Sequence, residues 1–548
     1  MQTGARRSRI AASIVLAALA YAEEARAIGP GEVYVRLTGT DGGECTDAAP
    51  CRSIAYGLGK LETVGGGMLH LGVGTFTQSD VNTNEPQGLC RRIPSHTAIV
   101  GEGGPTDKSL IQAYERDFVD AQGTSYASCG AFVAIAARDD IHFQNLIFDG
   151  NNQAFTPSPA SCADASNLGS ECGLISLTGG CTDVTFTDVE IRHSMMSAVY
   201  IRGTDEERDQ SAEGIQFVRC FMHDSGDLQI GPFDHHIYAN DVINFLVEDS
   251  VFTRSAGFGI QIQADHHHPP PGMEPAFASD IIIRRNLIVD NGKGAGGGVY
   301  LLNTTGQNLL ENNVIARNGG DGLRMASGVS GWTIRHNTFH DNDAIGITPT
   351  QYPFHVVSAF GADASFVNNI FTGNDAVFYT PDATLRGDTN ILVGEQVVAG
   401  GNLDMFTNTL TTPPAFVAAD DLHLAPGSAG IDAAAPSETV DDLDRLLRPG
   451  GQANDLGAYE LEGEPATGGA GGGGGASSAS GGSPSGGSSS GDGAAGGGDG
   501  GDDDGGSCAC SLSAPRNQTL PWVLTGLCAA AVLRRQRRRP AWSGEKQP

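Results

Sequence analysis

Positive charge is scarce in this chain, and lysine is almost missing. The 548 residues hold 33 Lys and Arg against 64 Asp and Glu, which gives a formal net charge of −31. Only four residues are lysines, at positions 60, 108, 293 and 546. A nucleic-acid-binding protein needs a basic face that displaces counterions from phosphates, so this balance excludes that class. A mechanism that uses a lysine as base also has few candidates.

Long apolar runs are absent as well. The segments Ile10–Ala20 and Leu520–Leu533 are both shorter than the ~20 residues that a helix needs to cross a bilayer. The cysteines between positions 45 and 220 contain no Cys-x-x-Cys spacing, which disfavours a zinc site among them. Glycine, by contrast, is abundant, and 20 of the 77 glycines lie between Gly468 and Gly506. The others indicate a folded part that is dense in turns.

The first residues have the pattern of an export signal. Arginines at positions 6, 7 and 9 precede Ile10–Ala20, and small residues follow, ending at Ala22 or Ala27. We therefore expect residues 1–27 to be a signal peptide, cleaved at one of these two sites. In an oxidising compartment the eight cysteines of the first half are expected to pair. Loop lengths favour the following set among many possible pairings: Cys45–Cys51, Cys162–Cys172, Cys90–Cys129 and Cys181–Cys220.

The last residues predict an anchor. Residues 463–507 are rich in Gly, Ser and Asp, which is typical of a disordered linker. Cys508 and Cys510, a short apolar transmembrane segment and an arginine cluster follow within 508–540, ahead of a tail at 541–548. This arrangement resembles the MYXO-CTERM sorting signal, which implies a sorting protease as partner and retention on a Gram-negative cell surface. A plain single-pass membrane anchor would place the protein at the same location.

The middle of the chain is a loose repeat. Asparagine followed by an apolar pair recurs at Asn286, Asn313, Asn337 and Asn369, with weaker cognates from Asn145 onwards. Each period holds three short strands bounded by Gly, Asn or Asp. Asparagine tolerates left-handed turns and can form stacked amide ladders. The sequence therefore predicts an all-β fold, a three-strand parallel β-helix of roughly 9–11 coils over residues 28–400, capped by 401–462.

Two further segments resemble known secreted proteins. The opening at 32–36, 39–43, 50–54 and 72–76 is similar to that of right-handed β-helix proteins of the pectin-lyase-like superfamily. The closing segments Leu422–Asp432, Arg448-Pro449 and Asp455–Glu460 resemble the tail of the choice-of-anchor Q group. The resemblance implies a right-handed β-helix on the cell surface, and it leaves the activity open because this fold carries many functions.

One outer face is predicted to bind sugar. In the second strand of each period, alternate positions are apolar and face the core, and the others carry hydrogen-bonding or aromatic side chains. Rows of such groups offer flat faces for stacking and many polar contacts to a polysaccharide. The predicted outer set is Tyr200, Arg202, His236, Tyr238, Asn240, Gln261, Gln263, Tyr300 and Arg324.

A short motif adds a catalytic hypothesis. Residues 233–236, Phe-Asp-His-His, resemble the Phe-Asp-Pro-His motif of alginate C5-epimerases. The resemblance implies that His236 is the base and that Asp234 helps to bind a uronate, with Tyr238 or Tyr200 as proton donor. The chain departs from the motif at His235, where the family has proline, and at Gly231, where it has tyrosine.

Two functions remain open. One is a surface lyase or epimerase acting on an acidic polysaccharide, and the other is a non-catalytic adhesin or matrix protein. No cofactor is expected, although Ca²⁺ stays possible because related folds bind it. Weak metal candidates are Asp265, His266 and His268, which can converge only if they lie in a loop.

Overall fold

The computed structural model of the protein describes residues 28–77, 93–113, 118–119, 125–126, 133–151, 174–194, 196–203, 211–226, 234–264, 278–292, 296–342, 357–401 and 403–461. The expected signal peptide, linker and sorting signal, with Cys508 and Cys510, lie outside these ranges. Within the ranges, no helix combines the length and the apolar character needed to cross a membrane.

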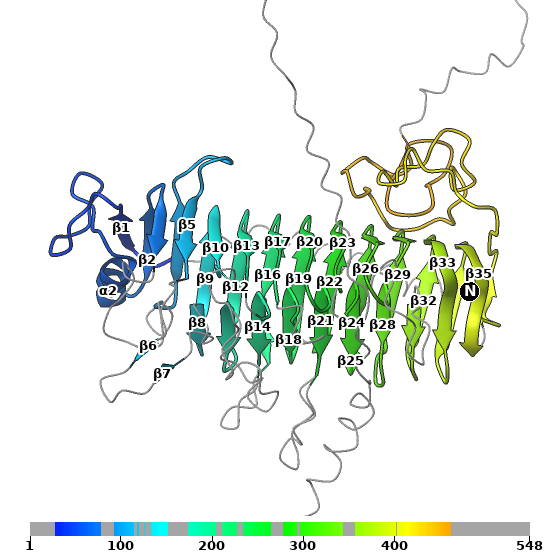
Figure 1. Cartoon of the computed structure of the whole chain (residues 1–548), viewed down its shortest axis with the longest axis horizontal. Coiled ribbons are helices and arrows are strands. Elements are labelled where there is room, and N and C mark those ends of the chain that lie inside the picture. Colours follow the sequence, from blue (N-terminus) through cyan, green and yellow to red (C-terminus); the bar gives the residue numbers. More distant parts are fainter. Residues whose placement is uncertain are drawn as a thin grey trace, which may run out of the picture. The chain divides into compact units, whose positions relative to one another are not determined.

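The chain between residues 31 and 407 winds into a parallel β-helix, as the repeat predicts (Figure 1). Each coil passes from a third sheet to a first sheet and then to a second sheet. The first sheet contains β1 (Gly31–Val35), β2 (Gly67–Leu71), β4 (Thr97–Gly101), β9 (Asp139–Gln144), β12 (Thr182–Thr187), β15 (Ala212–Glu213), β16 (Gln216–Val218), β19 (Val242–Glu248), β22 (Ala278–Arg284), β25 (Thr304–Thr305), β26 (Asn308–Glu311), β29 (Trp332–Arg335), β32 (Asp363–Val367), β34 (Thr384–Asp388) and β36 (Phe406–Thr407).

The second and third sheets are joined by two long strands, β33 (Ile370–Thr380) and β35 (Ile391–Gly401), which extend through both. The second sheet also contains β3 (Thr75–Thr77), β5 (Ser109–Gln112), β10 (Leu146–Asp149), β13 (Glu190–Arg192), β17 (Phe221–His223), β20 (Val251–Thr253), β23 (Leu287–Val289), β27 (Val314–Ala316) and β30 (Thr338–His340). The third contains β8 (Val133–Ala136), β11 (Ile175–Thr178), β14 (Val199–Arg202), β18 (Ile237–Asn240), β21 (Ile260–Gln263), β24 (Val299–Leu302), β28 (Leu323–Met325) and β31 (Val357–Ala359). A separate antiparallel pair is formed by β6 (Phe118–Val119) and β7 (Ser125–Tyr126).

Inward side chains of successive coils pack on their equivalents. Phe143, Phe186 and Phe217 are in register on β9, β12 and β16, and adjacent rings stack with centroids 4.9 Å apart. All three rings are at most 1% exposed. The alternation of each short strand thus builds one continuous apolar core along the coils.

The repeated asparagines form a buried ladder at the corner between the first and second sheets. The ladder runs through Asn286, Asn313, Asn337, Asn369 and Asn390, each 0% exposed. Each amide donates to the side-chain oxygen of the next asparagine at 2.9–3.0 Å. A second ladder joins Asn291, Asn318 and Asn342 at the next corner. The predicted amide ladders are therefore confirmed.

The left-handed residue of this corner is not the ladder asparagine. Positive φ angles of 52°, 52° and 51° occur at Arg285, Asn312 and His336, each one residue earlier. In the early coils, Asn145 and Asp188 hold this left-handed position, with φ of 55° and 56°. The sequence repeat was therefore aligned one residue off for these two coils, because Asn and Asp suit both positions.

Asn313→Ala is expected to lower the free energy of unfolding by about 2–3 kcal/mol. The Asn313 side chain accepts from Asn286 N–H and donates to the Ile283 carbonyl. Its removal takes away the hydrogen bond of the buried Asn286 N–H and one of the bonds that the Ile283 carbonyl accepts. Urea unfolding followed by circular dichroism measures the change. The matched control is Asn454→Ala, since Asn454 is half-buried and its side chain donates to Ser437 at 3.2 Å; equal losses for both variants would contradict a ladder role.

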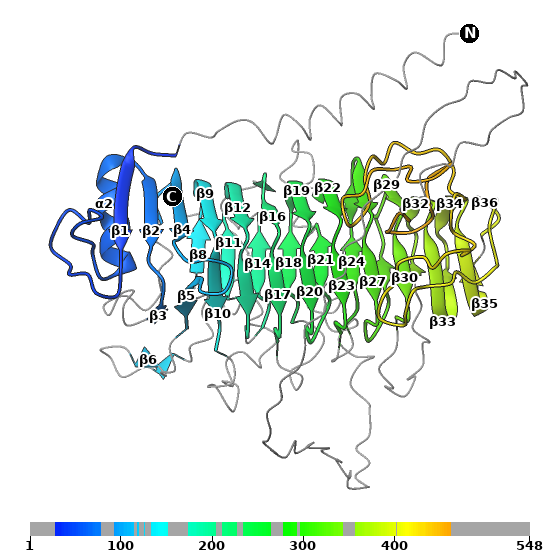
Figure 2. The same cartoon turned by 90° about the horizontal axis from the view of Figure 1, so that it is seen from above.

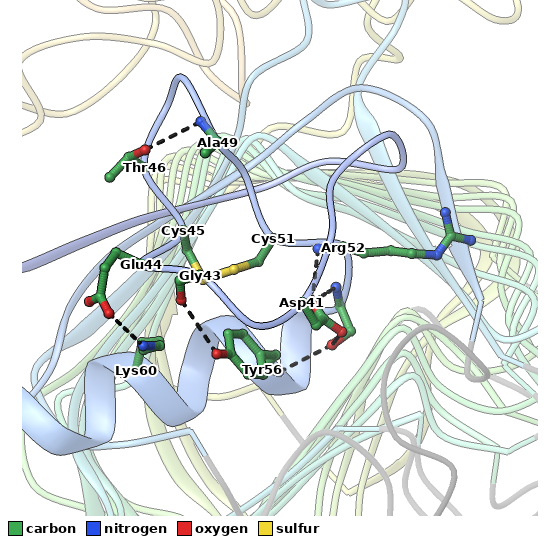
Figure 3. The surroundings of a disulfide bond; sticks show 11 residues. Asp41, Gly43, Glu44, Cys45, Thr46, Ala49, Cys51, Arg52, Tyr56 and Lys60 are labelled. Atoms are coloured by element: carbon green, nitrogen blue, oxygen red, sulfur yellow. Dashed lines mark hydrogen bonds and ion pairs between the residues drawn. A yellow bond between two sulfur atoms is a disulfide. The ribbon is translucent and has the colours of Figure 1, made fainter.

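The N-terminal end is closed by α2 (Ile54–Val64), whose N-cap Ser53 accepts from Tyr56 N–H. Figure 3 shows the loop above this helix, pinned by a disulfide between Cys45 and Cys51. In the same loop the Asp41 carboxylate accepts from the backbone of Ser53 at 3.0 Å. The predicted Cys45–Cys51 pair is thus confirmed, whereas Cys90, Cys129, Cys162 and Cys172 lie outside the described residues.

The predicted Cys181–Cys220 pair is wrong. Both residues are buried free thiols. Cys181 lies where a coil enters the first sheet, and its thiol bonds to the Thr178 carbonyl. Cys220 lies at the other end of that sheet one coil later, where its thiol bonds to the Phe186 carbonyl. Sequence spacing could not show that the two cysteines occupy different corners of the coil.

Alkylation of Cys181 and Cys220 is expected to require unfolding. Burial raises the pKa of Cys220 to about 12 and also raises the pKa of Cys181, so neither offers a thiolate at neutral pH. Iodoacetamide labelling followed by peptide mapping should modify them only in denaturant. Cys45 and Cys51 serve as internal controls that stay unmodified until a reductant is added. Rapid labelling of Cys220 in the native protein would contradict its burial.

Residues 403–461, here called the cap, fold back over the outer face of the second sheet (Figure 2). Leu422 and Ala458 pack against Val314 and Ala316 of β27. Leu424 and Leu456 cover Ile370 and Ile391 in the same way. The cap also makes polar contacts at the border with the first sheet, where Thr439 donates to Glu311. The apolar outer residues of these coils are explained by this cover.

Candidate functional site

The outer side chains of the third sheet lie in rows along the coils, as strand alternation predicts. One row joins equivalent positions of β14, β18, β21, β24 and β28: Tyr200, Tyr238, Gln261, Tyr300 and Arg324. A second row, two residues further along each strand, contains Arg202, Asn240 and Gln263. The strand register thus places eight of the nine predicted residues in these two rows, and their role in binding stays a prediction.

Aromatic rings connect successive coils along the first row. Tyr200 stacks on Tyr238 with centroids 5.5 Å apart, and Tyr238 stacks on His235 at 5.4 Å. His235 contacts Phe258 at 5.9 Å, and Phe258 stacks on Tyr300 at 5.3 Å. We call these five residues the aromatic array. Four coil steps of about 4.8 Å separate β14 from β28. The aromatic array and Arg324 together therefore extend about 19 Å along the coils.

His236 does not belong to the outer face, and its predicted position there is wrong. The residue precedes β18 and is 0% exposed. Its Nε2 donates to the Thr253 carbonyl at 2.9 Å, which leaves Nδ1 to accept from the Ser225 hydroxyl at 3.1 Å. Burial lowers the pKa of His236 to about 3. Strand alternation fails here because the chain turns the corner at this residue.

His235 takes the outer position that was expected of its neighbour. It is 1% exposed, and its Nδ1 accepts a hydrogen bond from the Phe258 N–H at 2.8 Å. Burial lowers the pKa of His235 to about 3, so the ring is neutral and its proton is on Nε2. Nε2 has no hydrogen-bond partner among the described residues. Its Nε2–H is therefore a buried donor that the described residues leave unmatched.

Largely buried amide groups lie beside the array. Gln261 donates to Gln263, and Gln263 donates to the Tyr238 hydroxyl, both at 2.9 Å. These two hydrogen bonds fix the orientation of the two amides and of the phenol. The Oδ1 of Asn240, in a residue 2% exposed, has no hydrogen-bond partner within the described part of the chain. One donor and one acceptor thus lie buried beside the array without a partner among the described residues.

The charged groups of the site lie at its two ends. The Arg324 Nε donates to Asp321 at 2.7 Å, and the guanidinium lies 5.7 Å from the centroid of the Phe258 ring. Arg202 lies on β14, four coils away. Asp234, expected to help to bind a uronate, is only 1% exposed. Its Cβ approaches the corner at Gly226, where an added Cβ would lie 2.3 Å away.

The described residues contain no cluster of His, Cys, Asp or Glu that could hold a metal ion. The weak metal candidates Asp265, His266 and His268, like Phe233 of the short motif, lie outside the described ranges. His235 and Phe258 were missed as site residues because both precede their strands by two residues. The spacing from each to its strand, Ile237 or Ile260, is the same in both coils, which is a signal that an alignment of coils could have used.

A family profile agrees with the observed fold. The profile of the family described as "Right handed beta helix region" matches residues 169–305 and 293–386. No curated protein resembles the sequence closely enough to count as a relative. Together with the coil geometry, the profile supports a right-handed parallel β-helix.

Several solved structures are similar to the chain. One is the A-module of the mannuronan C-5 epimerase AlgE6 from Azotobacter vinelandii, at 14% identity and a TM-score of 0.41, over 66% of this chain and 95% of that one. XylC in complex with xylose gives 8% identity and a TM-score of 0.43, over 78% of this chain and 98% of that one. Pectate lyase Pel9A gives 10% identity and a TM-score of 0.34, over 78% and 96%. At these identities the similarity concerns the fold alone.

Proposed function

We propose that this protein binds a polysaccharide along the aromatic array of the third sheet. The observation that supports the proposal most is the stack of five rings, flanked by oriented amides and by two unmatched polar atoms, His235 Nε2 and Asn240 Oδ1. The rings stack on one another, so their edges and hydroxyls are what they turn to a ligand, and sugar hydroxyls both donate and accept hydrogen bonds. A sugar chain laid along the coils would meet one such set of groups after another.

Binding is favoured over lyase or C5-epimerase chemistry because the histidines are poor bases. A general base needs a reachable lone pair and a pKa near the working pH. His236 uses both ring nitrogens inside the corner, and His235 uses its only lone pair to accept from Phe258. The low pKa of both rings opposes proton uptake. We therefore assign neither histidine the role of general base.

The proposal includes a location. Export by residues 1–27 and retention through residues 508–540 would place the array outside the cell, where polysaccharides of the envelope or matrix are available. A role as an adhesin or matrix component would follow. Cell fractionation of the tagged protein, with and without residues 508–540, tests this location.

Tyr238→Ala is expected to weaken polysaccharide binding by about tenfold, because the ring is the centre of the array and such anchors contribute on the order of 1–2 kcal/mol. Affinity gel electrophoresis of the purified full chain in a panel of polysaccharides measures the change. Tyr238→Phe keeps the ring and should lose less. Tyr34→Ala is the matched control, since Tyr34 lies on β1, far from the array, and stacks on His70 of β2. Unchanged binding in Tyr238→Ala would rule out the array as the site.

A further inference from the structure

Apart from Arg202, the charged groups along the aromatic array cancel among the described residues. Asp321, whose side chain is 1% exposed, pairs with Arg324 at one end. His235 is neutral because burial lowers its pKa to about 3. The remaining polar groups of the rows are amides and phenols. Arg202, at the other end, is then the one cation of the two rows that no described acid compensates.

A uronate polymer does not fit this pattern. Such a polymer carries a carboxylate on every sugar, so a stretch lying over four coil steps brings several charges to the array. A buried charge without a partner is costly, and one arginine at one end cannot neutralise them all. The protein as a whole has a formal net charge of −31, which repels an anionic chain before contact.

We propose that the array selects a neutral polysaccharide and disfavours a uronate polymer. This inference rests on the proposed function and names its ligand class. The polar side chains of the two rows support it: the amides of Gln261 and Gln263 and the phenol of Tyr238 match hydroxyls, which can both donate and accept, whereas a carboxylate can only accept. The acidic glycan expected from the short sequence motif is replaced by a neutral one.

The test compares neutral and acidic polymers on the full chain. Each affinity gel contains one polymer, either neutral (galactomannan or β-glucan) or acidic (alginate or polygalacturonate). Each gel is run at low and at high NaCl. A neutral polymer is expected to bind with a dissociation constant that changes by less than about twofold with salt, because no ion pair forms. The uronates are expected to bind at least about tenfold more weakly.

A gain-of-function variant makes the test sharper. Asp321→Asn removes the counter-charge of Arg324 while it keeps the shape of the side chain. Uronate binding is then expected to rise by about tenfold at low salt and to fall back at high salt. Asp363→Asn is the matched control, because Asp363 pairs with Arg386 on the exposed first sheet and its loss changes net charge equally.

The outcomes separate the two proposals. Tighter binding of alginate than of the neutral polymers, lost in Tyr238→Ala, would overturn the neutral-ligand inference and leave the array as a glycan site. Absence of binding to both classes would overturn the proposed function itself. Equal gains in Asp321→Asn and Asp363→Asn would show that net charge, rather than the pair at the array, controls uronate binding, and would also overturn the inference.

Discussion

Arg448→Ala is expected to lower the free energy of unfolding by about 3–5 kcal/mol, because it leaves a buried carboxylate without its partner. Arg448 and Glu460 form an ion pair at 2.6 Å inside the cap, with side chains 0% and 1% exposed. The same guanidinium donates to the carbonyls of Asp455 and Gly457. It also reaches the Asn312 side chain at 3.3 Å, so it ties the cap to the coils.

Two variants separate this pair from general loss of charge. Arg448→Lys keeps the charge, but a single ammonium cannot reach all four acceptors, so most of the loss should remain. Arg386→Ala removes an arginine that pairs with Asp363 on the surface and should cost at most about 1 kcal/mol. Urea unfolding gives the energies, and limited proteolysis within 403–461 reports release of the cap. A loss below about 1 kcal/mol in Arg448→Ala would contradict the buried pair.

The sequence predicts the coils well because the ladder position is repeated. Asn286, Asn313, Asn337 and Asn369 stand in the same place of successive coils, and a side chain that must bond to its own equivalent leaves a regular trace. Alternation likewise predicts the outer rows, since it holds wherever a strand is straight. Both signals are local, and the structure adds only their register.

What the sequence could not predict lies at corners and between distant segments. His235 and His236 exchange their expected positions because the chain bends before Ile237, where alternation no longer applies. The fate of Cys181 and Cys220 depends on which corner each occupies. The contact of Asp441 with Arg285 joins residues 156 positions apart and leaves no pattern in either segment.

Acid is expected to destabilise the β-helix well before its carboxylates are protonated. Burial lowers the pKa of His235 and His236 to about 3, and it holds the pKa of His336 well below its ordinary value. The unfolded chain takes up these protons near pH 6.5, so their contribution to stability is complete above that pH and is lost as the pH falls towards the folded pKa. At pH 5.5 the loss is about 1.4 kcal/mol for each of the first two residues.

In the cap, protonation of two groups has the opposite effect on stability. Although burial works against it, hydrogen bonds to Asp444 and Asp421 raise the pKa of His423, and burial raises the pKa of Asp455 to about 6. Protonation of these two groups favours the folded cap as the pH falls. As the pH falls, the coils are therefore expected to lose more stability than the cap. Proteolysis within 403–461 can report on the cap separately.

Urea unfolding at pH 7.5 and pH 5.5 checks the acid prediction, with an expected fall of about 3 kcal/mol from His235 and His236 together. His236→Gln cannot take up a proton, so its loss between the two pH values should be smaller by about 1.4 kcal/mol, whatever its stability at pH 7.5. Phe366→Leu is the control, since it loosens the buried core without removing a titrating group, and its loss between the two pH values should equal that of the parent protein. If His236→Gln and the parent lose the same amount, the buried neutral state of His236 is wrong. In that case the argument that His236 cannot act as a base would also be wrong.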